Sequence, residues 1–176
     1  EKRRVEAETL RKSIDEARAL LKETPELVKK VKELWKRYPE KKAALLPAMH
    51  LIQKERGGWV SAETIKETAA RFPVPHIHVQ GIVGFYDMFH DEPVGRHVVR
   101  LCKTLSCKLR GADELRAHIK RTYGVDHGQT TPDGAFTFRC FECLGHCTTA
   151  PMMLVDEERH ENLTPEKVDR VLGALR

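Results

Sequence analysis

The chain has 176 residues and a net charge of +5, enough length to bury a substantial core. It contains no apolar run approaching ~18 residues, so no membrane-spanning helix is expected. The positive surplus lies within residues 1–42, which hold 14 basic and 9 acidic residues, and the first 34 residues lack aromatic side chains. Because nucleic-acid binding combines basic residues with aromatic stacking platforms, this charge is better explained as a solvated helix surface, and nucleic acid is not an expected partner.

The first half of the sequence predicts a helical bundle. Residues 1–22 carry a thin apolar stripe among many charges, which predicts an extra charged helix on the surface or against a partner. A second stripe runs from Leu27 to Trp35, and a richer apolar run extends from Ala43 to Gln53. Ser61 is a predicted N-cap for a fourth helix, and a further short helix is expected between Ile77 and Phe89.

After Pro93 the pattern becomes that of a small α/β domain. The expected elements are a strand at His97–Leu101, a helix at Asp113–Tyr123, strands at Phe136–Cys140 and Met152–Val155, and a terminal helix capped by Thr164. The predicted organisation is therefore an extra charged helix at 1–22, a helical bundle at 23–92 and an α/β domain at 93–176.

Four of the five cysteines form two close pairs, Cys102 with Cys107 and Cys143 with Cys147. Both pairs follow predicted strand ends, where loops at one edge of a sheet meet. Each interval lets one loop direct two thiolates at a common point, which predicts a metal site. By ligand count the set suits zinc or an iron–sulfur cluster equally well, although the 35 residues between the pairs are many for a compact zinc ribbon.

The remaining thiol, Cys140, leaves an odd cysteine count, which argues against a disulfide framework. Cys140 shares strand parity with Phe136 and Phe138, so we predict that it packs in the core. Its spacing to Cys143 nevertheless forms a second candidate ligand pair, Cys140-x2-Cys143.

Longer motifs surround these cysteines. They are Cys102-Lys-Thr-Leu-Ser-Cys107, the turn Thr131-Pro-Asp-Gly134 and Glu142-Cys-Leu-Gly-His-Cys-Thr-Thr-Ala-Pro151. With Val79–Tyr86, Pro93–His97 and Asn162–Glu166, they resemble the thioredoxin-like 2Fe-2S ferredoxin family. The resemblance extends over about residues 40–176, and residues 1–22 have no counterpart in it.

The resemblance implies an α/β fold, with a thioredoxin-like 2Fe-2S ferredoxin domain preceded by an N-terminal helical bundle. It also implies one 2Fe-2S cluster held by Cys102, Cys107, Cys143 and Cys147. The implied partner is a flavoprotein subunit that binds FMN and NADH. The implied role is electron transfer, without substrate chemistry on this chain, in the peripheral arm of an NADH:quinone oxidoreductase (complex I) at the cytoplasmic face of the inner membrane.

Two other functions stay open. The equivalent subunit of an NAD-linked hydrogenase or formate dehydrogenase would share this domain and its flavoprotein partner. A zinc-stabilised interaction module is the alternative from a different class, and iron with acid-labile sulfide would exclude it.

Several residues near the ligands have expected supporting roles. Lys103 and neighbouring basic residues could offset the negative charge of a cluster, and Gly145 permits the tight loop that such a cluster requires. His146 lies in the same loop, and we interpret it as an outer residue, because four cysteines already complete the ligand set.

The expected partner interface combines the helical bundle with the cluster loops. Phe85, Tyr86, Met88 and Phe89 are too crowded to enter one core stripe, so some of them should face outward as anchors. Lys108, near the first cysteine pair, is expected at the same interface.

Overall fold

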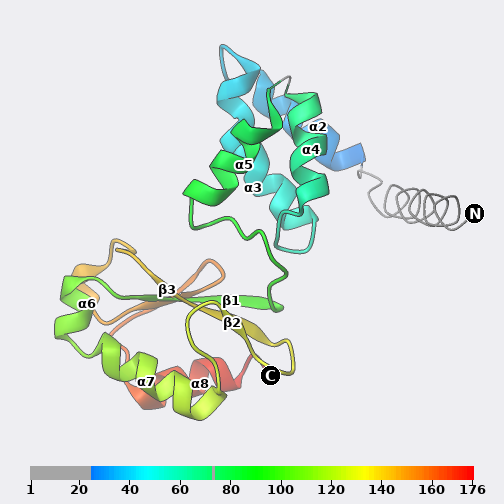
Figure 1. Cartoon of the computed structure of the whole chain (residues 1–176). Helices are drawn as coiled ribbons and strands as arrows, with labels where there is room; N and C mark the ends of the chain where they lie inside the picture. The colour runs from blue at the N-terminus through cyan, green and yellow to red at the C-terminus, as the bar shows by residue number, and fades with distance from the viewer. Residues whose placement is uncertain (1–24, 73) are drawn as a thin grey trace, which may run out of the picture. The chain divides into compact units, whose positions relative to one another are not determined.

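A computed structural model describes residues 25–72 and 74–176, so the predicted helix at 1–22 lies outside the described residues. The chain divides into two compact units, a helical unit that ends at Asp91 and an α/β unit at Glu92–Arg176 (Figure 1). The predicted fold class, helices followed by a mixed α/β domain, is confirmed. Within the described residues, no helix has the length and apolar character needed to cross a membrane.

The helical unit is built from short helices around one core. They are α2 (Pro25–Trp35), the 3-10 helix η1 (Lys41–Ala44), α3 (Leu45–Glu55), α4 (Ala62–Arg71) and α5 (His76–Phe85). The predicted cap of α4 is confirmed, since the hydroxyl of Ser61 accepts a hydrogen bond from the backbone N–H of Thr64 at 3.2 Å. Buried apolar side chains from α2 to α5 form the core, with Ala48, Met49, Val60 and Val79 fully enclosed.

Helix α5 ends at Phe85, whereas the sequence pattern predicted a helix that continues to Phe89. The difference arises from tertiary hydrogen bonds to the next residues. The side chain of Gln53 donates to the carbonyl of Met88 at 3.0 Å and accepts from the N–H of His90 at 2.8 Å. Because these backbone groups already have partners in α3, the chain leaves the helix and turns Phe89 into the core.

The α/β unit contains a five-stranded sheet in the order β2-β3-β1-β4-β5. Its elements are β1 (His97–Cys102), α6 (Leu105–Leu109), α7 (Ala112–Tyr123), β2 (Gln129–Thr130), β3 (Phe136–Phe141), η2 (Cys147–Thr149), β4 (Met153–Val155), β5 (Glu158–His160) and α8 (Pro165–Gly173). Strands β1 and β3 are parallel, and β4 pairs with β1 in the antiparallel sense. Helices α7 and α8 lie side by side beneath one face of this sheet (Figure 1).

The core of this unit follows the alternation of its strands. Val99 and Leu101 on β1 and Phe136 and Phe138 on β3 pack with apolar residues of α7 and α8. Gly124 ends α7 in the left-handed conformation, and Thr164 caps α8 by accepting the N–H of Lys167, both as predicted.

Gly95, two residues before the start of β1, lies close against the backbone of β3. A Cβ atom there would lie 2.8 Å from Cα of Phe136, which cannot move without displacing the paired strands. We therefore expect Gly95→Ala to lower the free energy of unfolding by about 1–3 kcal/mol, as measured by urea denaturation. The matched control is Gly84→Ala in α5, where a Cβ meets nothing within 4 Å, and a gain of about 0.5 kcal/mol is expected. Equal stability of both variants would contradict this close approach.

Candidate metal centre

The four paired cysteines lie at one edge of the sheet. Because β1 and β3 are parallel, their carboxyl ends reach the same edge, and the cysteine loops leave from those ends. Cys102 closes β1 and Cys107 lies in α6, and their exposed fractions are only 2% and 1%. Cys143 and Cys147, in the loop after β3, are both exposed. The edge thus presents one buried pair and one exposed pair of thiols.

The buried pair is held by hydrogen bonds to sulfur. The hydroxyl of Thr104 lies 3.2 Å from Sγ of Cys102, and the neighbouring thiol of Cys107 also favours the thiolate of Cys102. Burial alone raises the pKa of Cys102, but these hydrogen bonds outweigh it and lower the pKa below its ordinary value. Burial and the bond to Cys102 raise the pKa of Cys107 to about 11. One thiol of the pair is therefore favoured as a thiolate before the other.

The exposed pair is equally compact. The sulfur atoms of Cys143 and Cys147 are 3.8 Å apart, and the N–H of Gly145 points at Sγ of Cys143 at 3.4 Å. Gly145 adopts a φ of +83°, the left-handed region that glycine tolerates without cost, which agrees with its predicted place in a tight loop. The backbone N–H of Leu144, in the loop of the exposed pair, also favours the thiolate of Cys102 and helps to lower its pKa.

Further contacts tie the two cysteine loops together. The N–H of Cys102 donates to the carbonyl of Met152 at 3.2 Å, and the N–H of Lys103 donates to that of Phe141 at 2.9 Å. The ammonium group of Lys103 pairs with Glu142 at 2.9 Å. This ion pair links the residue after Cys102 to the residue before Cys143, a contact that sequence reasoning did not find.

Cys140 lies on the helix-covered face of the sheet, as its strand parity predicts. It is 8% exposed and belongs to the core that includes Phe138. Its backbone N–H donates to Nδ1 of His127 at 2.9 Å, and burial raises the pKa of its thiol. The buried pair belongs to a different apolar cluster, with Ala112 and Met152, so nothing in the packing associates Cys140 with the four paired thiols.

His146 has a partner at each ring nitrogen. Nδ1 lies 3.1 Å from a carboxylate oxygen of Glu161, and Nε2 faces the guanidinium of Arg159. This arrangement agrees with the interpretation that His146 is an outer residue. Lys108, expected near the partner interface, is exposed and pairs with Asp113 at 3.4 Å.

The geometry suits a binuclear centre. Within residues 25–72 and 74–176, no three His, Cys, Asp or Glu side chains converge closely enough to hold a single metal ion. The thiols stand instead as two pairs, and each pair has a hydrogen-bonding group at sulfur, the hydroxyl of Thr104 at Cys102 and the N–H of Gly145 at Cys143. Four cysteine thiolates are the donor set of a 2Fe-2S cluster, and hydrogen bonds to sulfur are a recognised means of setting its potential. The residues present therefore fit such a group.

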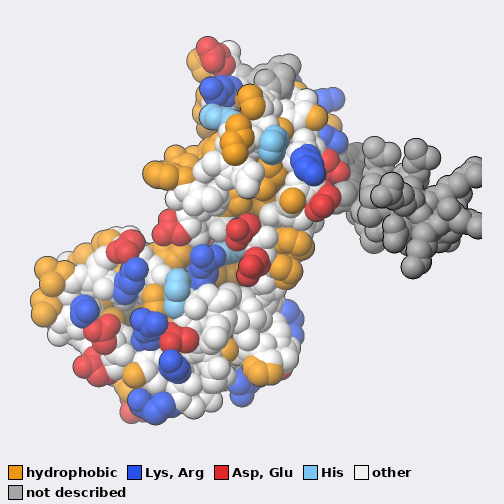
Figure 2. Space-filling view, in the orientation of Figure 1, with side chains coloured by type: hydrophobic (Ala, Val, Ile, Leu, Met, Phe, Trp, Pro, Cys, Tyr) orange, Lys and Arg blue, Asp and Glu red, His pale blue; other side chains and the backbone are white. Residues whose placement is uncertain are grey.

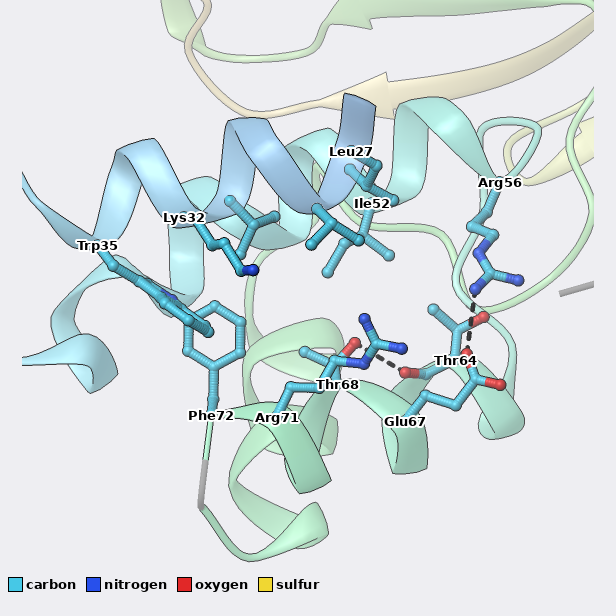
Figure 3. A pocket seen from close by; sticks show the side chains of 12 residues that line it. Leu27, Lys32, Trp35, Ile52, Arg56, Thr64, Glu67, Thr68, Arg71 and Phe72 are labelled. Atoms are coloured by element: carbon cyan, nitrogen blue, oxygen red, sulfur yellow. Dashed lines mark hydrogen bonds and ion pairs between the residues drawn. The ribbon is translucent and has the colours of Figure 1, made fainter. Parts of the chain in front are cut away.

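The helical unit contains a separate cavity between α2, α3 and α4 (Figure 3). Trp35 and Phe72 close one end with their rings in a T-shaped contact at 5.5 Å, and Arg56 pairs with Glu67 at 3.0 Å at the other end. None of the described residues that line it is a cysteine or histidine, so the cavity offers no soft metal ligand.

The aromatic residues expected at a partner interface differ in exposure. Phe85 is 77% exposed, and Met88 is 37% exposed. Tyr86 is partly buried, and its ring contacts that of Phe85 at 5.0 Å. Phe89 is 3% exposed and packs on His50, so its side chain serves the core of the helical unit. Phe85 is thus the outward member of the set.

Sequence reasoning did not find a second apolar surface on α6. Leu105 and Leu109 are 72% and 77% exposed, and Figure 2 shows hydrophobic side chains gathered at the end of the α/β unit where Figure 1 places α6. Residues four apart share one side of a helix, so burial of Cys107 turns both leucines outward. The cysteine motif does not show that Leu105–Leu109 forms a helix. Only knowledge of that helix could have indicated that the two leucines are exposed.

A thioredoxin-like α/β unit with two thiol pairs at one sheet edge defines a class, the small cluster-binding ferredoxins built on this fold. A family model described as "Thioredoxin-like [2Fe-2S] ferredoxin" matches residues 31–176. The chain belongs to this family, so the resemblance deduced from its motifs is confirmed.

Two curated relatives each match about four fifths of this chain. The chain is 40% identical over 140 residues to an NADH-quinone oxidoreductase subunit of Rhizobium meliloti (strain 1021), covering 80% of this chain and 83% of that protein. It is 36% identical over 149 residues to "NADH-quinone oxidoreductase subunit 2" of Thermus thermophilus, covering 83% and 82%. Both relatives are thus named as parts of NADH-quinone oxidoreductases.

Solved structures confirm the fold. A chain of the NAD+-reducing [NiFe]-hydrogenase in the H2-reduced state matches 74% of this chain with a TM-score of 0.64 and 21% sequence identity. This chain spans 22% of that hydrogenase chain, so the likeness concerns one domain of a longer protein.

Proposed function

We propose that the chain is an electron-transfer subunit that holds one 2Fe-2S cluster through Cys102, Cys107, Cys143 and Cys147. The observation that carries this proposal is the pairing of four thiols at one sheet edge, with the hydroxyl of Thr104 at the sulfur of Cys102 and the N–H of Gly145 at the sulfur of Cys143. Membership of a 2Fe-2S ferredoxin family supports it. When bound, the cluster would supply one-electron redox exchange.

The residues of this chain would bind and screen the cluster. The buried pair would hold it against the apolar wall of Ala112, Ala150 and Met152, while the exposed pair would leave one side open toward a partner. The N–H groups of Leu144 and Gly145 would stabilise negative charge on sulfur. Lys103 would contribute less, because its ammonium group is exposed and paired with Glu142.

The complex that we propose is an NADH:quinone oxidoreductase, in which the cluster exchanges electrons with FMN on an NADH-binding subunit. The names of the curated relatives support this choice. The chain would then reside at the cytoplasmic face of the inner membrane through that complex. The second candidate, a subunit of an NAD-linked hydrogenase, is supported by the fold match to such an enzyme.

Purification of the full chain and of its native complex tests the proposal. We expect two iron and two acid-labile sulfide per chain, a red-brown colour, and co-purification with a subunit that carries FMN. Quinone-reductase subunits in the complex would support the first assignment, and a nickel–iron subunit would support the second. Stoichiometric zinc without sulfide would refute both and leave an interaction module.

A further inference from the structure

The exposed thiol pair lies in a loop with little regular structure. Between β3 and η2, no helix or strand includes Cys143, Gly145 or His146. Both thiols are exposed, so packing around sulfur does not hold them as it holds Cys102 and Cys107. Some other contact must fix the direction of these two side chains if they are to bind a cluster in one geometry.

The side chain of His146 supplies such a contact. Its Nδ1 lies 3.1 Å from Oε1 of Glu161, and its Nε2 is bonded to Nη1 of Arg159. A guanidinium group can only donate, so Nε2 is the acceptor, and Nδ1 carries the proton that is donated to the carboxylate. The imidazole is therefore held at both ends, and both ring nitrogens are engaged by protein groups.

The partners of His146 belong to a rigid part of the unit. Arg159 lies in β5, which pairs with β4, and β4 pairs with β1, the strand that ends at Cys102. The backbone just after β5 is also bonded to the C-terminal end of the cysteine loop, since the N–H of Asn162 donates to the carbonyl of Thr149 at 2.8 Å. The imidazole thus connects the loop of the exposed pair to the sheet that carries the buried pair.

We propose that His146 is a positioning residue for the cluster, and that its two-ended contact with Arg159 and Glu161 orients Cys143 and Cys147. The clamp, as we name these three residues, acts through the thiolates and does not ligate metal. This inference rests on the proposed 2Fe-2S function for its effect on the cluster, whereas its effect on the loop requires no cluster.

The first test is the rate of cluster loss from the full chain to an iron chelator, followed by visible absorption under anaerobic conditions. We expect His146→Ala to accelerate the loss by about tenfold, because a less ordered loop holds its thiolates less firmly and residues that orient metal ligands typically change affinity by about 10–100-fold. The matched control is His97→Ala. His97 makes a similar contact with Asp156 at 2.7 Å, but at the other end of β1, roughly 17 Å from Cys102 by the rise of a strand.

Variants of Glu161 distinguish a specific effect on the orientation of the thiolates from a general loss of protein stability. Glu161→Ala removes the acceptor and should accelerate cluster loss, whereas Glu161→Gln keeps an amide oxygen in its place and should restore the slow rate. The double variant His146→Ala with Glu161→Ala should lose its cluster no faster than His146→Ala alone, because the two residues act together. The EPR spectrum of the reduced cluster should change in His146→Ala and stay unchanged in His97→Ala.

The second test uses the cluster-free chain and so stands apart from the proposed function. Amide hydrogen exchange in residues 143–149 should become at least several-fold faster in His146→Ala, with no change in β1 or α7. Normal exchange and normal cluster retention in His146→Ala would overturn the clamp. A wild-type chain that binds no cluster would refute the proposed function, while the exchange measurement would still decide whether His146 orders the loop.

Discussion

Serine at any one of Cys102, Cys107, Cys143 or Cys147 should lower the iron and sulfide content of the purified chain about tenfold or more. Removal of an outer partner typically costs 10–100-fold in metal affinity, and loss of a thiolate removes a bond to iron itself. Visible absorption and chemical assays of iron and sulfide measure the result. Because Cys102 and Cys107 are buried and the other two are exposed, a loss in all four variants would show that both pairs hold the cluster.

Cys140→Ser is the matched control for these variants. Cys140 is also a buried strand cysteine, but it packs in the core with Phe138. Its substitution should lower the free energy of unfolding by about 1 kcal/mol or more, through burial of a hydroxyl, and leave the cluster spectrum nearly intact. If Cys140→Ser lost its iron while Cys147→Ser kept a normal spectrum, the proposed ligand set would be wrong.

Glutamate at both Leu105 and Leu109 should weaken assembly with the FMN-binding subunit by roughly thirtyfold in Kd, or about 2 kcal/mol. Electron transfer requires the cluster to lie close to the flavin, so we propose that the partner covers the edge where the cysteine loops emerge. Leu105 and Leu109 flank Cys107 at this edge, and each is more than two thirds exposed. Burying a carboxylate at either position would cost far more than burying leucine.

Smaller effects are expected from Phe85→Glu, which alters the exposed aromatic residue of the helical unit, and from Lys108→Glu, beside the first cysteine pair. Pull-down with the flavoprotein measures assembly, and visible absorption verifies that each variant keeps its cluster. Ala174→Glu is the control. Ala174 is exposed near the C-terminus, where Arg176 pairs with Asp133 in the turn before β3, at the sheet edge opposite the thiols. Normal assembly of the leucine variant with its iron retained would refute this docking face.

The motifs and periodicity of the chain were sufficient to identify its family and to predict most of its helices and strands. Strand alternation placed Cys140 in the core, and the Ser61 and Thr164 caps located the starts of two helices, because these features depend on neighbouring residues alone. The spacing of the four cysteines indicated a metal site, but it did not distinguish zinc from iron and sulfur. The longer motifs around the cysteines indicated the 2Fe-2S ferredoxin family, to which the chain belongs.

The groups that surround the thiols depend on tertiary contacts that the sequence pattern does not show. The end of α5 at Phe85 depends on Gln53 in another helix, and the partners of His146 come from β5 and the chain after it. The exposure of Leu105 and Leu109 follows from the burial of Cys107 within one turn of helix. Each of these contacts joins residues that are distant in the sequence or depends on which side of an element is buried. Local pattern carries information about periodicity and capping, whereas packing determines which neighbours a side chain meets.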